Sequence, residues 1–238
     1  MLPITEQTNV SYTQVELPSG KKIGIKPWRV KEERELLFAI EGQENEDDVR
    51  KEIVKLISKC CDNQDLFNTL SNVDYVFMLA QLRKLSKGTK IEYTLKCTNP
   101  SCKFELSDDI DLESDLQIKK YKQTTVKINE TVSIALREVS FKEFDVLKQK
   151  YERLTEYNYH FILKSIDTII IDGQIYSEFT SQELADYIDN LKPTELKILS
   201  DAIDSSIAEI ELKKELTCKR CGTKNDVNFG DLYYFLGF

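Results

Sequence analysis

The spacing of hydrophobic and polar residues predicts a hairpin followed by helices over the first 88 positions. Two short β-prone runs, 12–17 and 22–28, flank the turn signal Pro18-Ser19-Gly20, so an N-terminal β-hairpin is predicted within residues 1–28. Apolar residues then recur at helical spacing, which predicts a helical region over 29–88. Its helices are expected at 30–41, from the acidic run 44–48 through Cys60, and at 72–86, the last being the buried centre of the group.

A β-like pattern replaces the helical one after Gly88. Residues 90–96 alternate and run straight into Cys97, and alternation continues over 103–136. We therefore expect a strand meander in the segment 89–137, with the dipeptide Asn129-Glu130 at one of its turns.

Helical signals return over 138–208. Ser140 with Glu143 and Thr180 with Glu183 read as capping boxes, which begin helices. The first of these helices is expected to place Phe144, Leu147, Tyr151 and Leu154 on one stripe, with further helices over 157–168 and from Pro193 onwards. Asp172-Gly173 between two isoleucine-rich runs predicts a small hairpin.

The last segment, 209–238, begins with a predicted strand over 209–217 that runs into Cys218. It ends in the most aromatic stretch of the chain, 231–238, which either folds onto the protein's own core or anchors a partner. Together the five segments predict an α+β fold of helical layers and β-hairpins in one compact unit.

Composition narrows the functional classes. The 238 residues are 41% hydrophobic with only 8 Gly and 5 Pro, enough for a real core and without a linker-like run. The start lacks a signal-peptide pattern and no apolar run is long enough to span a membrane, so we expect a soluble, cytosolic protein. A net charge of −8 makes nucleic acid a poor candidate partner.

Four cysteines form the strongest motif. Cys97-x4-Cys102 and Cys218-x2-Cys221 each lie between a β-prone approach and a β-prone exit, the pattern of a split zinc ribbon built from two knuckles. Gly222 suits the left-handed turn of such a knuckle. Four thiolates complete a tetrahedral site and leave no open position. We therefore predict one structural Zn²⁺ bound by Cys97, Cys102, Cys218 and Cys221, with an iron–sulfur centre, a redox pair and free thiols as alternatives.

The basic residues near these cysteines have two interpretations. They are Lys96, Lys103, Lys219, Arg220 and Lys224. The simpler interpretation is that they offset the negative charge of the thiolates. The alternative is a nucleic-acid-binding zinc ribbon, which would act through Lys213, Lys214, Lys219 and Arg220.

Other candidate residues favour structural roles. Cys60-Cys61 resembles a redox pair, but Cys60 lies on the apolar stripe of its helix and reads as a core residue. His160 is the single histidine and has no accompanying Ser or Cys motif, so a packed or partly exposed role is favoured over catalysis. No phosphate-binding, nucleophile-elbow or metalloprotease motif occurs, and we expect no enzyme activity.

An acidic stretch follows the first knuckle. Asp109, Asp111, Glu113 and Asp115 alternate with the apolar residues Ile110 and Leu112, so the acids are expected on one face of a strand with the apolar residues facing the core. Solvation is the simpler interpretation of this acidic face. A docking face for a basic partner is the alternative.

A family resemblance adds to this reading. Its residues are Leu17-Pro18-Ser19-Gly20 before an acidic helix, then Asp74, Leu82-Arg83, Ser86 and Gly88, the strand ending at Cys97, and Cys218-x2-Cys221-Gly222. In combination, chiefly over 13–106 and 209–230, they resemble the baseplate proteins of T-even phages, small tail proteins of contractile-tailed phages associated with the baseplate hub.

The resemblance implies a late structural protein needed to build, or resident in, the baseplate hub, acting by binding other tail proteins. It implies assembly in the host cytoplasm, a place in the virion tail, and no catalytic residues. Neither nucleic acid nor membrane is an expected partner. A nucleic-acid-binding zinc ribbon and a zinc-stabilised enzyme remain the alternatives.

Overall fold

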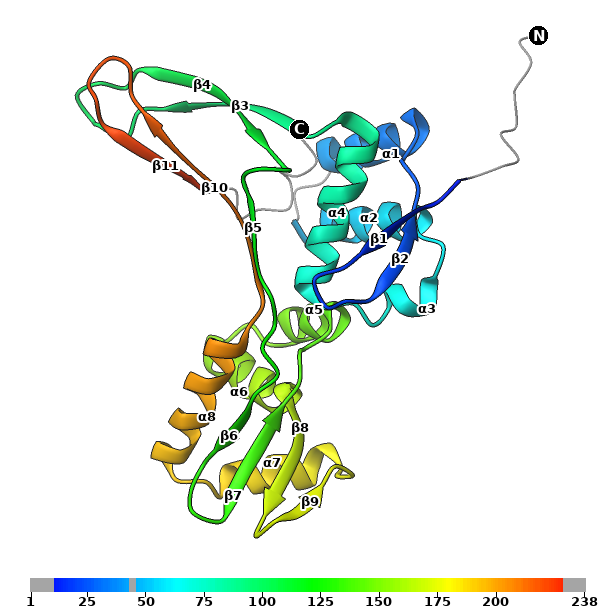
Figure 1. Cartoon of the computed structure of the whole chain (residues 1–238), viewed down its shortest axis with the longest axis vertical. Helices are drawn as coiled ribbons and strands as arrows, with labels where there is room; N and C mark the ends of the chain where they lie inside the picture. The colour runs from blue at the N-terminus through cyan, green and yellow to red at the C-terminus, as the bar shows by residue number, and fades with distance from the viewer. Residues whose placement is uncertain (1–10, 43–45, 229–238) are drawn as a thin grey trace. The chain divides into compact units, whose positions relative to one another are not determined.

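The computed structural model of the chain describes residues 11–42 and 46–228 (Figure 1). The chain divides into two compact units, whereas the sequence predicts a single one. The first, which we call the cysteine unit, comprises Met1–Phe67, Val76–Ile118 and Ile210–Phe238. The second, which we call the sheet unit, comprises Asn68–Tyr75 and Lys119–Glu209. The mixture of helices and small antiparallel sheets confirms the predicted α+β class.

Among the described residues, eleven elements lie wholly or mostly in the cysteine unit. Its helices are α1 (Val30–Gly42), α2 (Glu46–Lys59), α3 (Gln64–Phe67) and most of α4 (Asn72–Lys87). Its strands are β1 (Thr13–Glu16), β2 (Lys22–Ile25), β3 (Lys90–Lys96), β4 (Glu105–Asp111), β5 (Leu116–Lys119), β10 (Glu209–Thr217) and β11 (Lys224–Asn228). The short helix α3 was not predicted, because a single turn leaves no periodic pattern.

The N-terminal hairpin forms as predicted and contacts residues 60–62, which directly follow α2. Strands β1 and β2 pair antiparallel, and Gly20 in the turn has φ +85°. The amide of Gly24 donates to Asp62 Oδ1 at 2.9 Å, and the Asp62 amide donates to the Gly24 carbonyl at 3.0 Å. A Cβ at Gly24 would lie 2.2 Å from Asp62 Oδ2, so this contact requires glycine.

Helix α4 is buried, as its sequence predicts. Met78, Leu79 and Leu82 are fully buried in the cysteine unit. Ser86 near the helix end accepts a hydrogen bond from the Trp28 amide at 3.0 Å. The helix ends at Lys87, and the φ of +94° at the next residue, Gly88, allows the chain to turn into β3.

The predicted meander over 103–136 is wrong, because its strands pair in three different sheets. Strand β4 pairs with β3, and β5 pairs with β10 in a sheet of order β11-β10-β5. The strands β6 (Thr125–Lys127) and β7 (Val132–Leu136) belong to a third sheet. One predicted turn exists: Asn129 Oδ1 accepts from the Val132 amide at 2.9 Å and closes the β6–β7 hairpin.

The sheet unit is a four-stranded antiparallel sheet with helices packed on it. The sheet order is β6-β7-β8-β9, completed by β8 (Ile166–Ile171) and β9 (Gln174–Tyr176). Its helices are α5 (Phe141–Lys150), α6 (Leu154–Ser165), α7 (Ser181–Asp189) and α8 (Pro193–Ser206). The core joins β7 and β8 to α6, α7 and α8 through buried residues such as Ile134, Ile162, Leu184 and Leu199.

Sequence signals in the sheet unit that depend only on neighbouring residues are confirmed. Asp172 and Gly173 have φ +50° and +81° in the β8–β9 turn, the positive values that a tight hairpin requires. Both capping boxes form: Ser140 with Glu143, and Thr180 with Glu183. Pro193 is the first residue of α8.

The single stripe predicted from Phe144 to Leu154 is wrong. Helix α5 ends at Lys150, and Tyr151 adopts an extended conformation at its C-cap. Leu154 begins a new helix with a different phase and is 72% exposed. The helix predicted over 157–168 therefore begins three residues earlier and ends at Ser165, since the following residues pair with β7.

Glu143 is a partly buried carboxylate of the sheet unit that accepts several hydrogen bonds. Arg137 donates to its two oxygens at 2.6 and 3.0 Å, and the Ser140 amide donates at 3.1 Å. Burial disfavours the charged carboxylate, but these hydrogen bonds outweigh burial and lower the pKa of Glu143 from 4.5 to about 2.

The depressed pKa of Glu143 predicts how stability depends on pH. A group whose folded pKa lies below its unfolded pKa stabilises the protein above the unfolded value, and this contribution falls as pH drops from about 5 towards 2. Because the pair is partly exposed, we expect a contribution on the order of 2 kcal/mol at pH 7. Glu143→Gln should remove this contribution at pH 7 and flatten the pH dependence in urea unfolding, whereas Glu178→Gln, at an exposed position, should do neither. An unchanged pH profile in Glu143→Gln would contradict the assignment.

Candidate metal centre

The first knuckle lies at the tip of the β3–β4 hairpin. The strands pair in register up to Lys96 opposite Glu105, and the Cys97 amide donates to the Phe104 carbonyl at 2.9 Å. The chain then reverses around Asn99, whose carbonyl accepts from the Cys102 amide at 3.0 Å. The four-residue gap between the cysteines is therefore accommodated as a tight loop.

The second knuckle lies at the tip of the β10–β11 hairpin. Thr217 pairs with Lys224, and the Cys218 amide donates to the Thr223 carbonyl at 2.8 Å. The Gly222 amide returns a 2.8 Å bond to the Cys218 carbonyl, with φ +73° at the glycine. This is the left-handed position expected for Gly222.

The structure brings the four predicted cysteines together at these two tips, which lie at the same end of the cysteine unit (Figure 1). Their four sulfurs all lie within 4.8 Å of one another. Cys97 Sγ is 3.6 Å from Cys221 Sγ, and Cys102 Sγ is 3.8 Å from Cys218 Sγ. Sulfurs bonded at about 2.3 Å to one tetrahedral metal would be about 3.8 Å apart, whereas a disulfide requires about 2.05 Å. The cluster can hold a metal ion.

The four cysteines differ in burial and in the hydrogen bonds that their sulfurs receive. Cys97 and Cys218 are buried, Cys102 is half-buried and Cys221 is exposed. Hydrogen bonds from the side chain and backbone of Thr223 lower the pKa of Cys221 to about 6. A backbone hydrogen bond from Phe104 lowers the pKa of Cys102, but burial and the neighbouring thiols raise it to about 11. Four sulfurs this close repel one another as thiolates, and a bound cation would remove that penalty.

Residues that are not ligands also connect the knuckles. Asn225 on β11 is 1% exposed, and its side chain bonds Thr98, which directly follows Cys97. Asn99 Nδ2 lies 3.4 Å from Thr223 Oγ1 across the same gap. The sequence did not single out these residues, because their partners are more than a hundred positions away.

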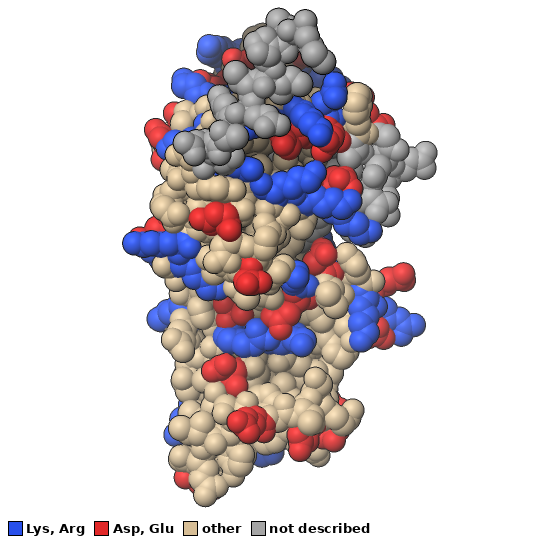
Figure 2. Space-filling model, turned by 90° about the vertical axis from the view of Figure 1, so that its right-hand side faces the viewer, with Lys and Arg blue, Asp and Glu red and all other residues tan. Residues whose placement is uncertain are grey.

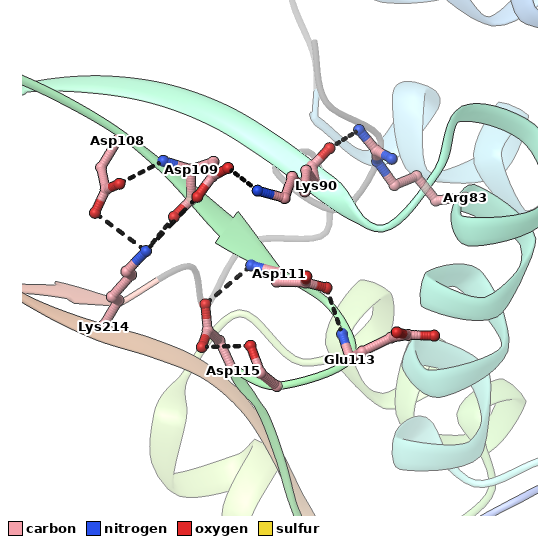
Figure 3. A network of polar contacts seen from close by, with 9 residues as sticks. Arg83, Lys90, Asp108, Asp109, Asp111, Glu113, Asp115 and Lys214 are labelled. Atoms are coloured by element: carbon pink, nitrogen blue, oxygen red, sulfur yellow. Dashed lines mark hydrogen bonds and ion pairs between the residues drawn. The ribbon is translucent and has the colours of Figure 1, made fainter.

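The acidic residues after the first knuckle are matched by lysines of the same unit (Figure 3). Lys214 on β10 lies 3.1 Å from Asp108, and Lys90 lies 2.6 Å from Asp109. The hydrogen bond from Lys214 lowers the pKa of Asp108. Ile110 and Leu112 are buried, as the alternation predicts. However, the strand ends at Asp111 and the rest of the acidic run folds into a turn.

That turn reverses the chain towards β5. The Asp115 amide donates to the Asp111 carbonyl at 2.8 Å, and the Asp111 amide donates to Asp115 Oδ2 at 2.9 Å. Glu113 forms an ion pair with Lys84. These contacts engage the acids within the protein, a third arrangement beside the solvated face and the docking face that the sequence suggests.

The surroundings of the other candidate residues, Cys60, Cys61 and His160, indicate structural roles. Cys60 and Cys61 are 2% and 6% exposed, and burial raises their pKa values to about 11 and 12, as expected of unreactive core thiols. His160 is half-buried and stacks on Tyr151 with ring centroids 4.0 Å apart. Within residues 11–42 and 46–228, the four-cysteine cluster is the single group arranged to hold a metal.

One family model matches the chain. It is described as the T4 bacteriophage base plate protein, and the match covers residues 9–237. The chain belongs to this family. Neither the curated proteins nor the solved structures yielded a match.

Family membership makes the chain a structural protein of a phage baseplate, whose partners are other baseplate or tail proteins. In the part of the baseplate protein that the structure describes, no helix combines the length and apolar character needed to cross a membrane. The aromatic stretch 231–238 lies outside the described residues, so both of its predicted roles, packing on the protein's own core and anchoring a partner, stay predictions.

Proposed function

We propose that this baseplate protein is a non-enzymatic component or assembly factor of the baseplate hub, acting by protein–protein binding, in which one structural Zn²⁺ joins the β3–β4 and β10–β11 hairpins. The observation that carries the metal assignment is the cluster of four sulfurs within 4.8 Å. Zinc is favoured because four thiolates at tetrahedral spacing form a closed site.

A closed site suits a structural role. Catalytic zinc needs a position open to water or substrate, and four cysteine ligands fill the tetrahedron. The cations predicted to balance the thiolates lie around the knuckles as exposed side chains, of which Lys224 pairs with Glu215 at 2.9 Å. The metal would thus hold two hairpins rigid and provide a firm base for a binding surface.

Two of the four basic residues on which the nucleic-acid alternative rests are paired with acids of the same chain. Lys213 pairs with Glu211 at 2.7 Å and Lys214 with Asp108 at 3.1 Å. On the face in Figure 2, basic and acidic side chains are interspersed. On a chain with a net charge of −8, this face offers no continuous attraction to a polyanion.

The hub assignment rests on the resemblance of residues 13–106 and 209–230 to hub-associated proteins and on family membership. Mass spectrometry of purified particles and of assembly intermediates tests it. We expect peptides of this chain in hub-containing intermediates, assembled in the host cytoplasm. Peptides in finished virions as well would make it a resident component, and their loss on maturation an assembly factor. Its occurrence only in particles that lack hub proteins would contradict the assignment.

A further inference from the structure

We propose that Asn225 is a positioning residue that locks the two cysteine knuckles in register, so that the protein itself assembles the metal site. This inference rests on the proposed metal function and adds to it a residue that is not a ligand. Asn225 lies on β11 opposite Leu216 of β10. Its side chain is turned away from solvent, with 1% of the residue exposed.

The side chain of Asn225 uses its full hydrogen-bonding capacity. Its Oδ1 accepts from the amide of Thr98 at 2.7 Å and from the hydroxyl of Thr98 at 2.9 Å. Its Nδ2 donates to the carbonyls of Thr223 at 2.9 Å and Leu216 at 3.2 Å. An amide side chain offers two acceptor positions and two donors, and all four are occupied here.

The four bonds reach both knuckles. Thr98 directly follows Cys97, whereas Leu216 and Thr223 flank Cys218 and Cys221 in the chain. The Thr223 carbonyl also accepts from the Cys218 amide at 2.8 Å, so one oxygen joins Asn225 to a ligand's own backbone. Asn225 therefore fixes the spacing between the two pairs of cysteines without touching a sulfur.

A fixed spacing between the two pairs of cysteines matters for metal affinity. Without it, the binding of the metal would also have to order both hairpins. Side chains outside the ligand set that orient metal ligands typically change metal affinity by about 10- to 100-fold when they are removed. Loss of Asn225 also removes its bonds to the Thr98 amide and to the carbonyls of Thr223 and Leu216, which loosens the contact between the tips. The effect should appear in affinity, while all four ligands and the one-to-one stoichiometry remain.

Metal titration of Asn225→Ala tests the inference. Purified full-length chain would be kept reduced, stripped of metal and titrated with zinc against a chromophoric chelator. We expect one site per chain with affinity about 10- to 100-fold below that of the wild type. Asp226→Ala is the matched control, because Asp226 is the adjacent residue of β11 but is exposed. The zinc affinity of this variant should equal that of the wild type.

Two further measurements separate positioning from general loss of fold. In the metal-free wild type, the Thr98 amide should exchange slowly with solvent, and Asn225→Ala should accelerate this exchange. Thr98→Val removes one hydroxyl bond but keeps the backbone bond, so it should fold even if Asn225→Ala does not and should weaken zinc binding several-fold.

The outcomes distinguish this inference from the proposed function. A folded wild type that binds no zinc would refute the metal function and this inference with it. The positioning role alone would be refuted if the wild type binds one zinc and Asn225→Ala binds zinc equally tightly. Equally tight zinc binding by a folded Thr98→Val would refute it in the same way.

Discussion

Cys218→Ser should reduce the zinc content from one ion per chain to nearly none and destabilise the cysteine unit by several kcal/mol. The Cys218 sulfur lies 3.8 Å from that of Cys102, although the two residues are 116 positions apart. Closing a loop of this length costs roughly 4 kcal/mol in chain entropy. Structural zinc sites supply binding free energy on the order of 10 kcal/mol, so losing a ligand removes a large stabilising contribution.

Cys60→Ala is the matched control for that experiment. It also removes a buried thiol from the cysteine unit, but not a predicted ligand. Its zinc content should stay at one per chain, with only the modest destabilisation expected of a small core truncation. Zinc content by elemental analysis and unfolding followed by circular dichroism provide the two readouts. Equal zinc in Cys218→Ser and wild type would contradict the ligand assignment.

Leu199→Ala should have the opposite pattern: a large loss of stability in the sheet unit with zinc content unchanged. Leu199 on α8 is fully buried in the core formed with β7, β8, α6 and α7. Truncating a buried leucine to alanine removes its transfer free energy and leaves a cavity, at a cost of about 3 kcal/mol. All four cysteines belong to the other unit, so metal binding should persist.

The neighbouring residue on the same helix gives the control. Ile198 is 42% exposed, so Ile198→Ala should change stability far less than Leu199→Ala does. The measurement is thermal unfolding together with elemental analysis of each variant. Equal destabilisation by the two substitutions would show that the core of this unit is assigned wrongly, and loss of zinc in Leu199→Ala would contradict the separation of the two effects.

Features that local chemistry determines could be predicted from the sequence. The Asp172-Gly173 turn needs two positive φ values, and the box of Ser140 with Glu143 needs only residues three apart. The cysteine pairs could be predicted because strand-to-cysteine transitions occur twice and four thiols complete one tetrahedral site. Proximity of all four sulfurs follows from that chemistry, and the structure shows it.

Features that depend on distant partners could not be predicted. Alternation over 103–136 indicates strands but does not specify their neighbours, so the pairing of β5 with β10 was missed. The predicted apolar stripe does not extend to Leu154, because α5 ends at Lys150 and Leu154 begins a separate helix. Asn225 looks like any polar strand residue until Thr98, 127 positions earlier, is placed beside it.

The division of the chain into five segments remains a prediction, although the structure shows how the two knuckle segments meet. The tips of β3–β4 and β10–β11 carry the four sulfurs, and Lys214 lies beside Asp108 farther along the same hairpins. The ion pair is partly exposed and should contribute about 1 kcal/mol or less. A bound zinc ion would therefore contribute far more free energy than this ion pair to holding the hairpins together.

Elemental analysis of the wild-type protein, purified under reducing conditions without added metal, tests whether the four cysteines hold zinc. We expect one zinc per chain, bound without visible absorption because zinc has no d–d transitions. A folded chain that contains no metal would contradict it, and so would iron accompanied by a charge-transfer spectrum, the signature of an iron–sulfur centre.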